Sequence, residues 1–193
     1  MADSDLRIEY ETHDGVRELL DCLVYSLEGI SLDFDRWNER YVKGPGMYIA
    51  VVTGPSVAAF ADPMGDNTWP TDRCRDVCLD LDVFFETARE VAMTRDGAVV
   101  ISVDGVIQEQ LVRFRDLAPD DRADVDSAAA EYEDWMGSRH MSALDTSRRP
   151  NVIATVTLSE ETGRVSVFQR GDFRTDVRPE LGGEWNVDGY RRR

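Results

Sequence analysis

The sequence predicts an α/β domain in which a central mixed β-sheet is flanked by helices on both faces. Short apolar, β-branched runs alternate with longer segments whose apolar residues recur at helical spacing. Some of these runs are joined by turn signals, as in antiparallel hairpins, whereas others are separated by a helix. A sheet built from both kinds of connection is mixed, and its apolar faces have to be covered by helices.

The first part of the chain predicts one helix and a pair of strands. A helix from about residue 14 to 29 is indicated by apolar residues that share one face: Val16, Leu19, Leu20, Leu23 and Leu27. Residues 47–52 form a continuous apolar run, which predicts a buried strand. A Gly-Pro turn would return the chain into a second strand at 57–61. The polar stretch 62–75 then predicts a loop.

The second part predicts further helices and two hairpins. A helical face covers 81–93, and a buried strand follows at 98–103. The Asp-Gly pair after it is a hairpin signal that leads into 106–114. An acidic helix is expected from about 120 to 135, and a second hairpin pairs the runs at 152–158 and 165–169.

These elements divide the chain into three parts. Residues 1–80 form an N-terminal helix and strand portion that packs with the main domain, and 81–175 form the core. Residues 176–193 form a charged C-terminal tail.

The charge balance of the chain is strongly acidic. Asp and Glu number 38 against 22 Lys and Arg, for a net charge of −16, and Lys43 is the only lysine. This composition fits either an acidic, self-repelling surface or adaptation to molar salt, where the Debye length falls to about 3 Å. We expect a salt-adapted (halophilic) protein. A general nucleic-acid-binding surface is not expected, and a small anionic ligand would need a local cluster of donors.

No export or membrane signal is visible in the sequence. The chain begins with acidic residues, and no run approaches the roughly 18 apolar residues of a membrane span. The three cysteines predict no disulfide framework. We therefore expect a cytoplasmic protein without a membrane partner.

Three short segments combine residue types that suit nucleotide chemistry. The first is Asp96-Gly97-Ala98, which lies between a predicted helix and a predicted strand. The acid could bind a metal, and the glycine would let a ligand approach the backbone. Asp-Gly is also an ordinary turn signal, so the segment alone decides nothing.

The second segment runs from residue 137 to 143 and reads Gly-Ser-Arg-His-Met-Ser-Ala. Ser138 is predicted as a helix N-cap, and the free amides that follow would favour an anion. Arg139 adds a fork of donors and His140 a possible metal ligand. The alternative is a capped helix whose Arg and His side chains are simply solvated.

The third segment, residues 158–163, places two carboxylates and a hydroxyl at the end of a buried strand. Ser159, Glu160 and Glu161 could supply hard oxygen ligands to Mg²⁺ or Mn²⁺ that bridges phosphates. The alternative is a polar hairpin turn. Together the three segments contain the parts of a metal-dependent nucleotide site.

In their order and context, the three segments resemble the diadenylate cyclase domain family. That family carries Asp-Gly-Ala, Gly-Thr-Arg-His-Arg and Ser-Glu-Glu-Thr-Gly motifs, and the resemblance covers residues 81–171. This chain is similar to an acidic, archaeal type of member. It differs in having Ser138 in place of Thr and Met141 in place of the second Arg. Arg148 or Arg149 would be candidates to replace the missing cation.

The resemblance implies a reaction in which two ATP molecules become cyclic di-AMP and two pyrophosphates, with Mn²⁺ or Mg²⁺ as cofactor. The 3′-hydroxyl of one ATP attacks the α-phosphate of the other across a facing homodimer or higher homo-oligomer. The implied catalytic residues are Asp96, Arg139, His140 and Glu161, and the implied metal ligands are Asp96, His140 and Glu161. The implied nucleotide contacts are Gly97, Ala98, Ser138, Arg139, Ser159 and Glu160.

Two other functions stay open at this point. One is a non-catalytic module that binds ATP or cyclic di-AMP, which Met141 favours because a phosphate donor is missing there. The other is an unrelated acidic α/β scaffold in which the three segments are turns and caps.

Overall fold

A five-stranded sheet lies at the centre of the computed structural model, which describes residues 13–54, 56–117 and 132–182. In chain order, its strands are β1 (Met47–Val52), β3 (Val99–Ser102), β5 (Val152–Leu158), β6 (Val165–Gln169) and β7 (Asp172–Asp176). They are arranged in space as β3-β1-β5-β6-β7. β1 and β3 are parallel and all other neighbours are antiparallel, so the sheet is mixed, as predicted.

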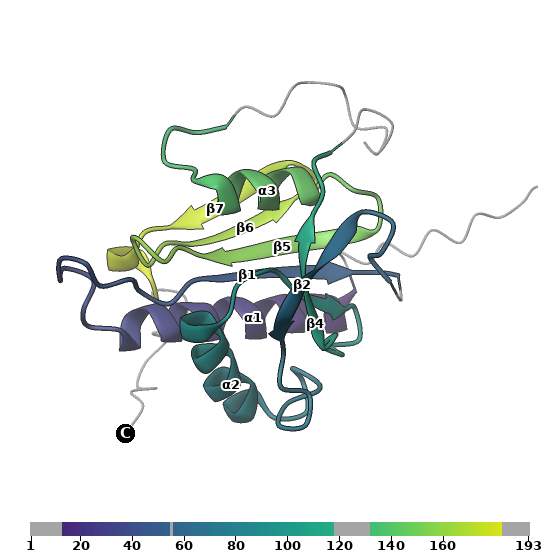
Figure 1. Cartoon of the computed structure of the whole chain (residues 1–193), viewed down its shortest axis with the longest axis horizontal. Coiled ribbons are helices and arrows are strands. Elements are labelled where there is room, and N and C mark those ends of the chain that lie inside the picture. The colour runs from purple at the N-terminus through teal and green to yellow at the C-terminus, as the bar shows by residue number, and fades with distance from the viewer. Residues whose placement is uncertain (1–12, 55, 118–131, 183–193) are drawn as a thin grey trace, which may run out of the picture.

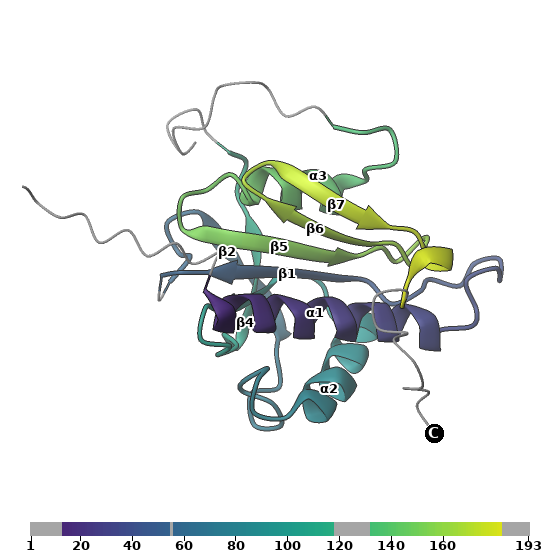
Figure 2. The same cartoon turned by 180° about the vertical axis from the view of Figure 1, so that it is seen from behind.

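Helices cover both faces of this sheet (Figure 1, and from behind in Figure 2). On one side lie α1 (Asp14–Asp33) and α2 (Leu81–Thr94), and on the other lies α3 (Ser138–Thr146). β1 serves both cores, because its alternate residues face opposite sides. Ile49 packs with α1 and α2, whereas Ala50 packs with α3. This burial on both faces explains why the strand is a continuous apolar run.

A second, two-stranded sheet corrects the prediction for residues 57–75. The predicted strand at 57–61 is wrong, and so is the first half of the loop predicted at 62–75, because β2 (Ala61–Thr68) pairs antiparallel with β4 (Gln110–Phe114). Residues 69–75 contain neither helix nor strand, as predicted. β1 needs no returning partner, since β3 and β5 already occupy its two edges. Pro63 is tolerated because β2 is an edge strand, where a missing N–H group costs little.

The remaining elements follow the predictions to different degrees. The helices at 14–29 and 81–93 and the hairpin of β5 and β6 are confirmed. The predicted hairpin after β3 is reduced to isolated bridges, such as Ala98 with Val112, because β4 pairs mainly with β2. β7 and the 3-10 helix η3 (Arg178–Glu180) were not predicted.

Part of the predicted helix at 120–135 lies outside the described residues, and its described portion, 132–135, is not helical. The three cysteines are free thiols, in agreement with the prediction. Among the described residues, no helix combines the length and apolar character needed to cross a membrane.

Candidate functional site

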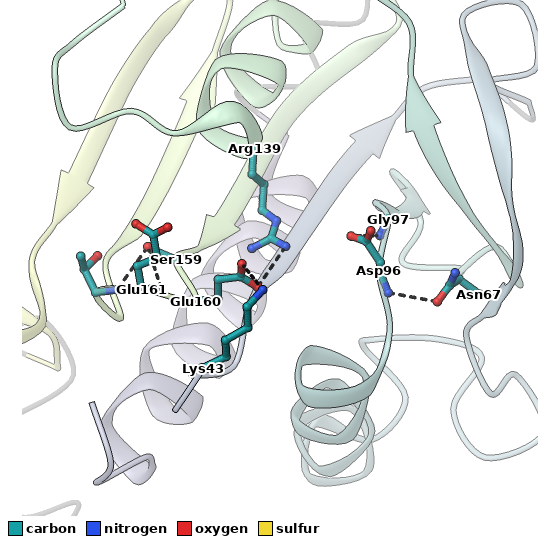
Figure 3. Close-up of polar contacts among 9 residues, drawn as sticks. Lys43, Asn67, Asp96, Gly97, Arg139, Ser159, Glu160 and Glu161 are labelled. Carbon is teal, nitrogen blue, oxygen red and sulfur yellow. Dashed lines mark hydrogen bonds and ion pairs between the residues drawn. The ribbon is translucent and has the colours of Figure 1, made fainter. Parts of the chain in front are cut away.

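The three segments singled out in the sequence meet at one end of the main sheet. β1 and β3 are parallel, so the segments that lead into them lie at the same end. β5 runs the other way and finishes there, with Leu158 opposite Met47. Asp96 therefore precedes β3 on one side of β1, the loop that begins at Ser159 follows β5 on the other side, and the start of α3 lies above them (Figure 3).

A cavity of about 530 Å³ opens between these segments. All the residues predicted for the site line it: Asp96, Gly97, Ala98, Ser138, Arg139, His140, Ser159, Glu160 and Glu161. The tertiary structure thus brings the predicted set together. The individual roles assigned to these residues stay predictions.

The Asp96-Gly97 turn presents an exposed carboxylate at the mouth of the cavity. Asp96 Oδ1 accepts a hydrogen bond from the Gly97 amide at 2.8 Å, and the Asp96 amide donates to Asn67 Oδ1 at 3.1 Å. Gly97 has a φ of +103°, and a Cβ there would lie 2.9 Å from Met64 Cγ. The backbone of this turn and the close packing of β2 therefore require a glycine at position 97, whether or not a ligand approaches it.

The start of α3 corrects the predicted N-cap. Gly137 is the cap residue, it makes no side-chain hydrogen bond, and Ser138 is the first residue of the helix. A Ser side chain would have covered one of the free amides of the first turn. Because glycine has no side chain, the helix opens toward the cavity with these amides uncapped by a side chain, which suits an anion.

Arg139 reaches from α3 toward the acidic loop (Figure 3). Its Nη2 lies 3.6 Å from Glu160 Oε2, while Lys43 Nζ lies 3.3 Å from Glu160 Oε1. A Cβ on Gly46 would lie 2.6 Å from Arg139 Nη1, so the glycine makes room for this side chain. Glu160 thus holds Arg139 in place, and an incoming phosphate has to compete with it.

The loop from Ser159 to Gly163 is organised by its own polar atoms. Ser159 Oγ accepts from the amides of Glu161 and Thr162 at 3.4 and 3.3 Å. The Gly44 amide donates to the Glu160 carbonyl at 3.0 Å, which ties the loop to the segment before β1. Ser159 keeps its hydroxyl proton available as a donor, and the Glu161 side chain is left exposed.

His140 is buried beside the cavity and only 6% exposed. Neither ring nitrogen has a hydrogen-bond partner among the described residues, and the ring packs edge-on against Trp135, with 5.1 Å between the ring centres. Burial, together with the charges of Arg139 and Arg164, lowers the pKa of His140 to about 4. The imidazole is therefore neutral at pH 7 and offers an acceptor as well as a donor.

This burial predicts a pH dependence of stability. Folded His140 stays neutral down to about pH 4, whereas the unfolded residue takes up a proton near its ordinary value of 6.5. The unfolded state then binds more protons, so the free energy of unfolding falls by about 3 kcal/mol as the pH drops from above 6.5 to about 4. Urea unfolding at a series of pH values measures this loss.

A matched pair of variants isolates the contribution of His140, because the described residues hold only one other histidine, the exposed N-cap residue His13. His140→Phe should remove most of the slope between pH 4 and 6.5, and His13→Asn should keep it. An unchanged slope in His140→Phe would contradict the assignment.

The donor set fits a metal that is bound together with phosphates. Within residues 13–54, 56–117 and 132–182, no three His, Cys, Asp or Glu side chains lie close enough to hold a metal by themselves. Asp96, His140 and Glu161 therefore do not form a preassembled cage. Mg²⁺ in nucleotide sites commonly takes one or two carboxylates and completes its shell with phosphate oxygens and water. The exposed carboxylate of Asp96 fits that kind of site.

The cavity also contains residues that the motifs did not indicate as site residues. Arg113 comes from β4, Trp135 precedes α3, and Arg164 follows the Ser-Glu-Glu-Thr-Gly segment directly. With Arg139, three arginines line the cavity together with four carboxylates: Asp96, Asp116, Glu160 and Glu161. The position of Arg164 at the end of the motif was the one signal that could have pointed to it.

This site belongs to a recognisable class. A mixed sheet with helices on both faces, uncapped helix amides and clustered arginines define a nucleotide-binding α/β domain. The sequence model of the family described as "DisA bacterial checkpoint controller nucleotide-binding" matches residues 77–173, about half of the chain. The chain belongs to this diadenylate cyclase domain family, in agreement with its motifs.

One solved structure shares the fold at low sequence identity, and a second match has a TM-score below 0.5. A hypothetical membrane spanning protein from Bacillus cereus is 18% identical with a TM-score of 0.54, over 82% of this chain. The matched part of this chain spans 63% of that protein's length. A double cysteine mutant of DacA from Staphylococcus aureus is 17% identical with a TM-score of 0.47, over 88% of this chain and 97% of that one. No curated protein matches the chain.

Proposed function

We propose that this protein is a cytoplasmic diadenylate cyclase that converts two ATP molecules into cyclic di-AMP and two pyrophosphates. The observation that carries the proposal is the meeting of the three motif segments around one cavity of about 530 Å³. Asp96, Arg139 and Glu161 are far apart in the sequence, and they reach the cavity from the loop before β3, from α3 and from the loop after β5. Membership of the diadenylate cyclase domain family supports the same activity.

The residues around the cavity would bind and orient one ATP. The uncapped amides of α3 and the Arg139 guanidinium would hold phosphate oxygens, and Ser138 and Ser159 would add hydroxyl donors. Asp96 would hold the divalent metal and help the attacking 3′-hydroxyl to lose its proton. When bound, Mn²⁺ or Mg²⁺ supplies positive charge to the phosphates. Alignment and charge neutralisation of this kind are what phosphoryl transfer asks of a protein.

The bonding changes require two nucleotides in line. The 3′-oxygen of one ATP forms a bond to the α-phosphorus of the other, and the bond to pyrophosphate breaks. A second such step closes the ring. Since each cavity would hold one nucleotide, two copies of the chain have to face each other, and we propose a facing homodimer.

The acidic composition supports a protein that works in high salt. With a net charge of −16, the chain repels both itself and ATP at low ionic strength. In molar KCl the Debye length falls to about 3 Å, so both repulsions are screened. We expect turnover to be higher in multimolar KCl than in dilute buffer.

The test is to incubate the purified protein with ATP and Mn²⁺ or Mg²⁺ in dilute and in multimolar KCl, and to identify products by mass spectrometry. Cyclic di-AMP is the expected product. No product in any salt, with ATP still raising the melting temperature, would indicate the non-catalytic module that Met141 favours. Neither product nor stabilisation would contradict a nucleotide site altogether.

A further inference from the structure

Arg164 lies between the Ser159–Gly163 loop and the first residue of β6, and it lines the cavity. Its guanidinium carbon lies 4.4 Å from the centre of the Trp135 ring, in a cation–π contact. Its backbone carbonyl accepts from the Ser159 amide at 2.9 Å, which ties its position to the acidic loop. Both Arg164 and Trp135 line the cavity, and both are half-buried.

The charge of Arg164 has no carboxylate partner among the residues that the structure describes. The side chain makes one hydrogen bond, from Nη1 to Thr175 Oγ1 at 3.3 Å. Arg139, in contrast, already faces Glu160 at 3.6 Å. Arg113 also lines the cavity, but it is exposed on β4, where water and salt screen its charge more strongly. Arg164 is therefore a half-buried cation that has no carboxylate partner among the described residues and can bind an anion through its other donors.

The neighbours of Arg164 also suit phosphate. Arg164 and His140 both contact the Trp135 ring, with 4.4 Å from the Arg164 guanidinium carbon to the ring centre and 5.1 Å between the centres of the two rings. Arg139 and the start of α3 line the same cavity. A phosphate in this cavity would therefore meet guanidinium donors as well as the free amides of the helix start.

Arg148 and Arg149, the candidates from the sequence to replace the arginine that the family has at position 141, do not line the cavity. Met141 packs against the apolar core on the α3 side of the sheet and is not part of the cavity wall. Arg149 is buried, with its guanidinium over the Phe60 ring at 4.8 Å and its Nη2 donating to the Arg115 carbonyl at 2.8 Å. Arg148 packs against Gly171 and does not line the cavity either.

We propose that Arg164 binds the phosphate groups of the nucleotide, with Trp135 as the platform that fixes its guanidinium, and so supplies the cation that Met141 lacks. This inference rests on the proposed function, because it assumes a nucleotide in this cavity. The Trp135 ring restrains the guanidinium, and the planar fork of an arginine can donate to two phosphate oxygens at once.

Equilibrium binding of ATP to the full-length protein tests the inference without relying on turnover. Arg164→Gln should raise the Kd for ATP about 10- to 100-fold, the range expected for the loss of a charge-assisted hydrogen-bonded pair. Arg89→Gln is the matched control, since it removes the same charge from an exposed pair with Glu86 on α2, outside the cavity. It should change the Kd less than 2-fold. Urea unfolding shows whether each variant is folded.

Arg164→Lys serves as a second variant that keeps the charge but loses the planar fork. It should raise the Kd about 3- to 10-fold. A Kd within 2-fold of the wild type in folded Arg164→Gln, or in Arg164→Lys if the Gln variant does not fold, would overturn the inference. Equal losses in Arg164→Gln and Arg89→Gln would also overturn it, because they would reflect net charge rather than a contact. If the wild-type protein bound no ATP, the proposed function itself would fail.

Discussion

Asp96→Asn should reduce cyclic di-AMP formation by about 100-fold or more, which is the scale of losing one preorganised charged group at a reacting centre. The variant removes the negative charge and keeps the shape. Its side-chain oxygen can still accept the 2.8 Å hydrogen bond from the Gly97 amide, so the turn should survive. Product formation at saturating ATP and metal, measured by mass spectrometry, reports the loss.

Asp35→Asn is the matched control for this variant. Asp35 is exposed and lies outside the cavity, so its replacement changes the net charge by the same amount without touching the site. We expect near wild-type turnover for Asp35→Asn. Turnover that survives in Asp96→Asn would remove the carboxylate from the mechanism and leave the metal assignment without support.

Gly163→Ala should destabilise the protein by about 4 kcal/mol. Gly163 has a φ of +69°, a conformation that costs a residue with a Cβ about 1–2 kcal/mol. The new methyl group would lie 2.6 Å from Ser31 Oγ and 2.9 Å from the Trp37 ring, and overpacking of this kind costs about 1–3 kcal/mol. The hydrogen bond from Ser31 Oγ to the Gly163 carbonyl, 2.6 Å long and buried, would be strained as well. Urea unfolding measures the loss.

Gly65→Ala separates the backbone cost from the packing cost. Gly65 has a similar φ of +58°, but no described residue has an atom within 4 Å of the position that a Cβ would take there. This variant should lose only about 1 kcal/mol. Equal losses in the free energy of unfolding at the two glycines would show that Ser31 and Trp37 move to make room for the methyl group. That result would contradict close packing of the Ser159–Gly163 loop against these two residues.

Gly163 illustrates why the residues of the site could be predicted from the sequence, whereas the contacts that hold them in place could not. The motif around Glu160 and Glu161 was visible as a polar turn after a buried strand. The contacts of Gly163 with Ser31 and Trp37, which lie more than 120 residues earlier in the chain, were not visible. The same holds for Arg139, whose pairing with Glu160 depends on α3 crossing above the end of β5.

Local pattern decided much of this protein. Apolar periodicity was sufficient for α1, α2 and the strands of the β5–β6 hairpin, because helix and strand periods are properties of neighbouring residues. The three motif segments were sufficient to predict the family, since the functional residues of each motif lie within a few positions of one another in the sequence.

Only the tertiary structure decided what depends on distant partners. Residues 61–68 became a strand because β4 offered a free edge, although their composition is that of a loop. His140 became a neutral, buried imidazole because Trp135 and the sheet exclude water from it. Arg164 became a candidate phosphate ligand because it lies over the Trp135 ring in the cavity wall and, in the part of the chain that the structure describes, has no carboxylate partner. Burial, pairing and charge environment are set by residues far apart in the chain, so no local pattern contains them.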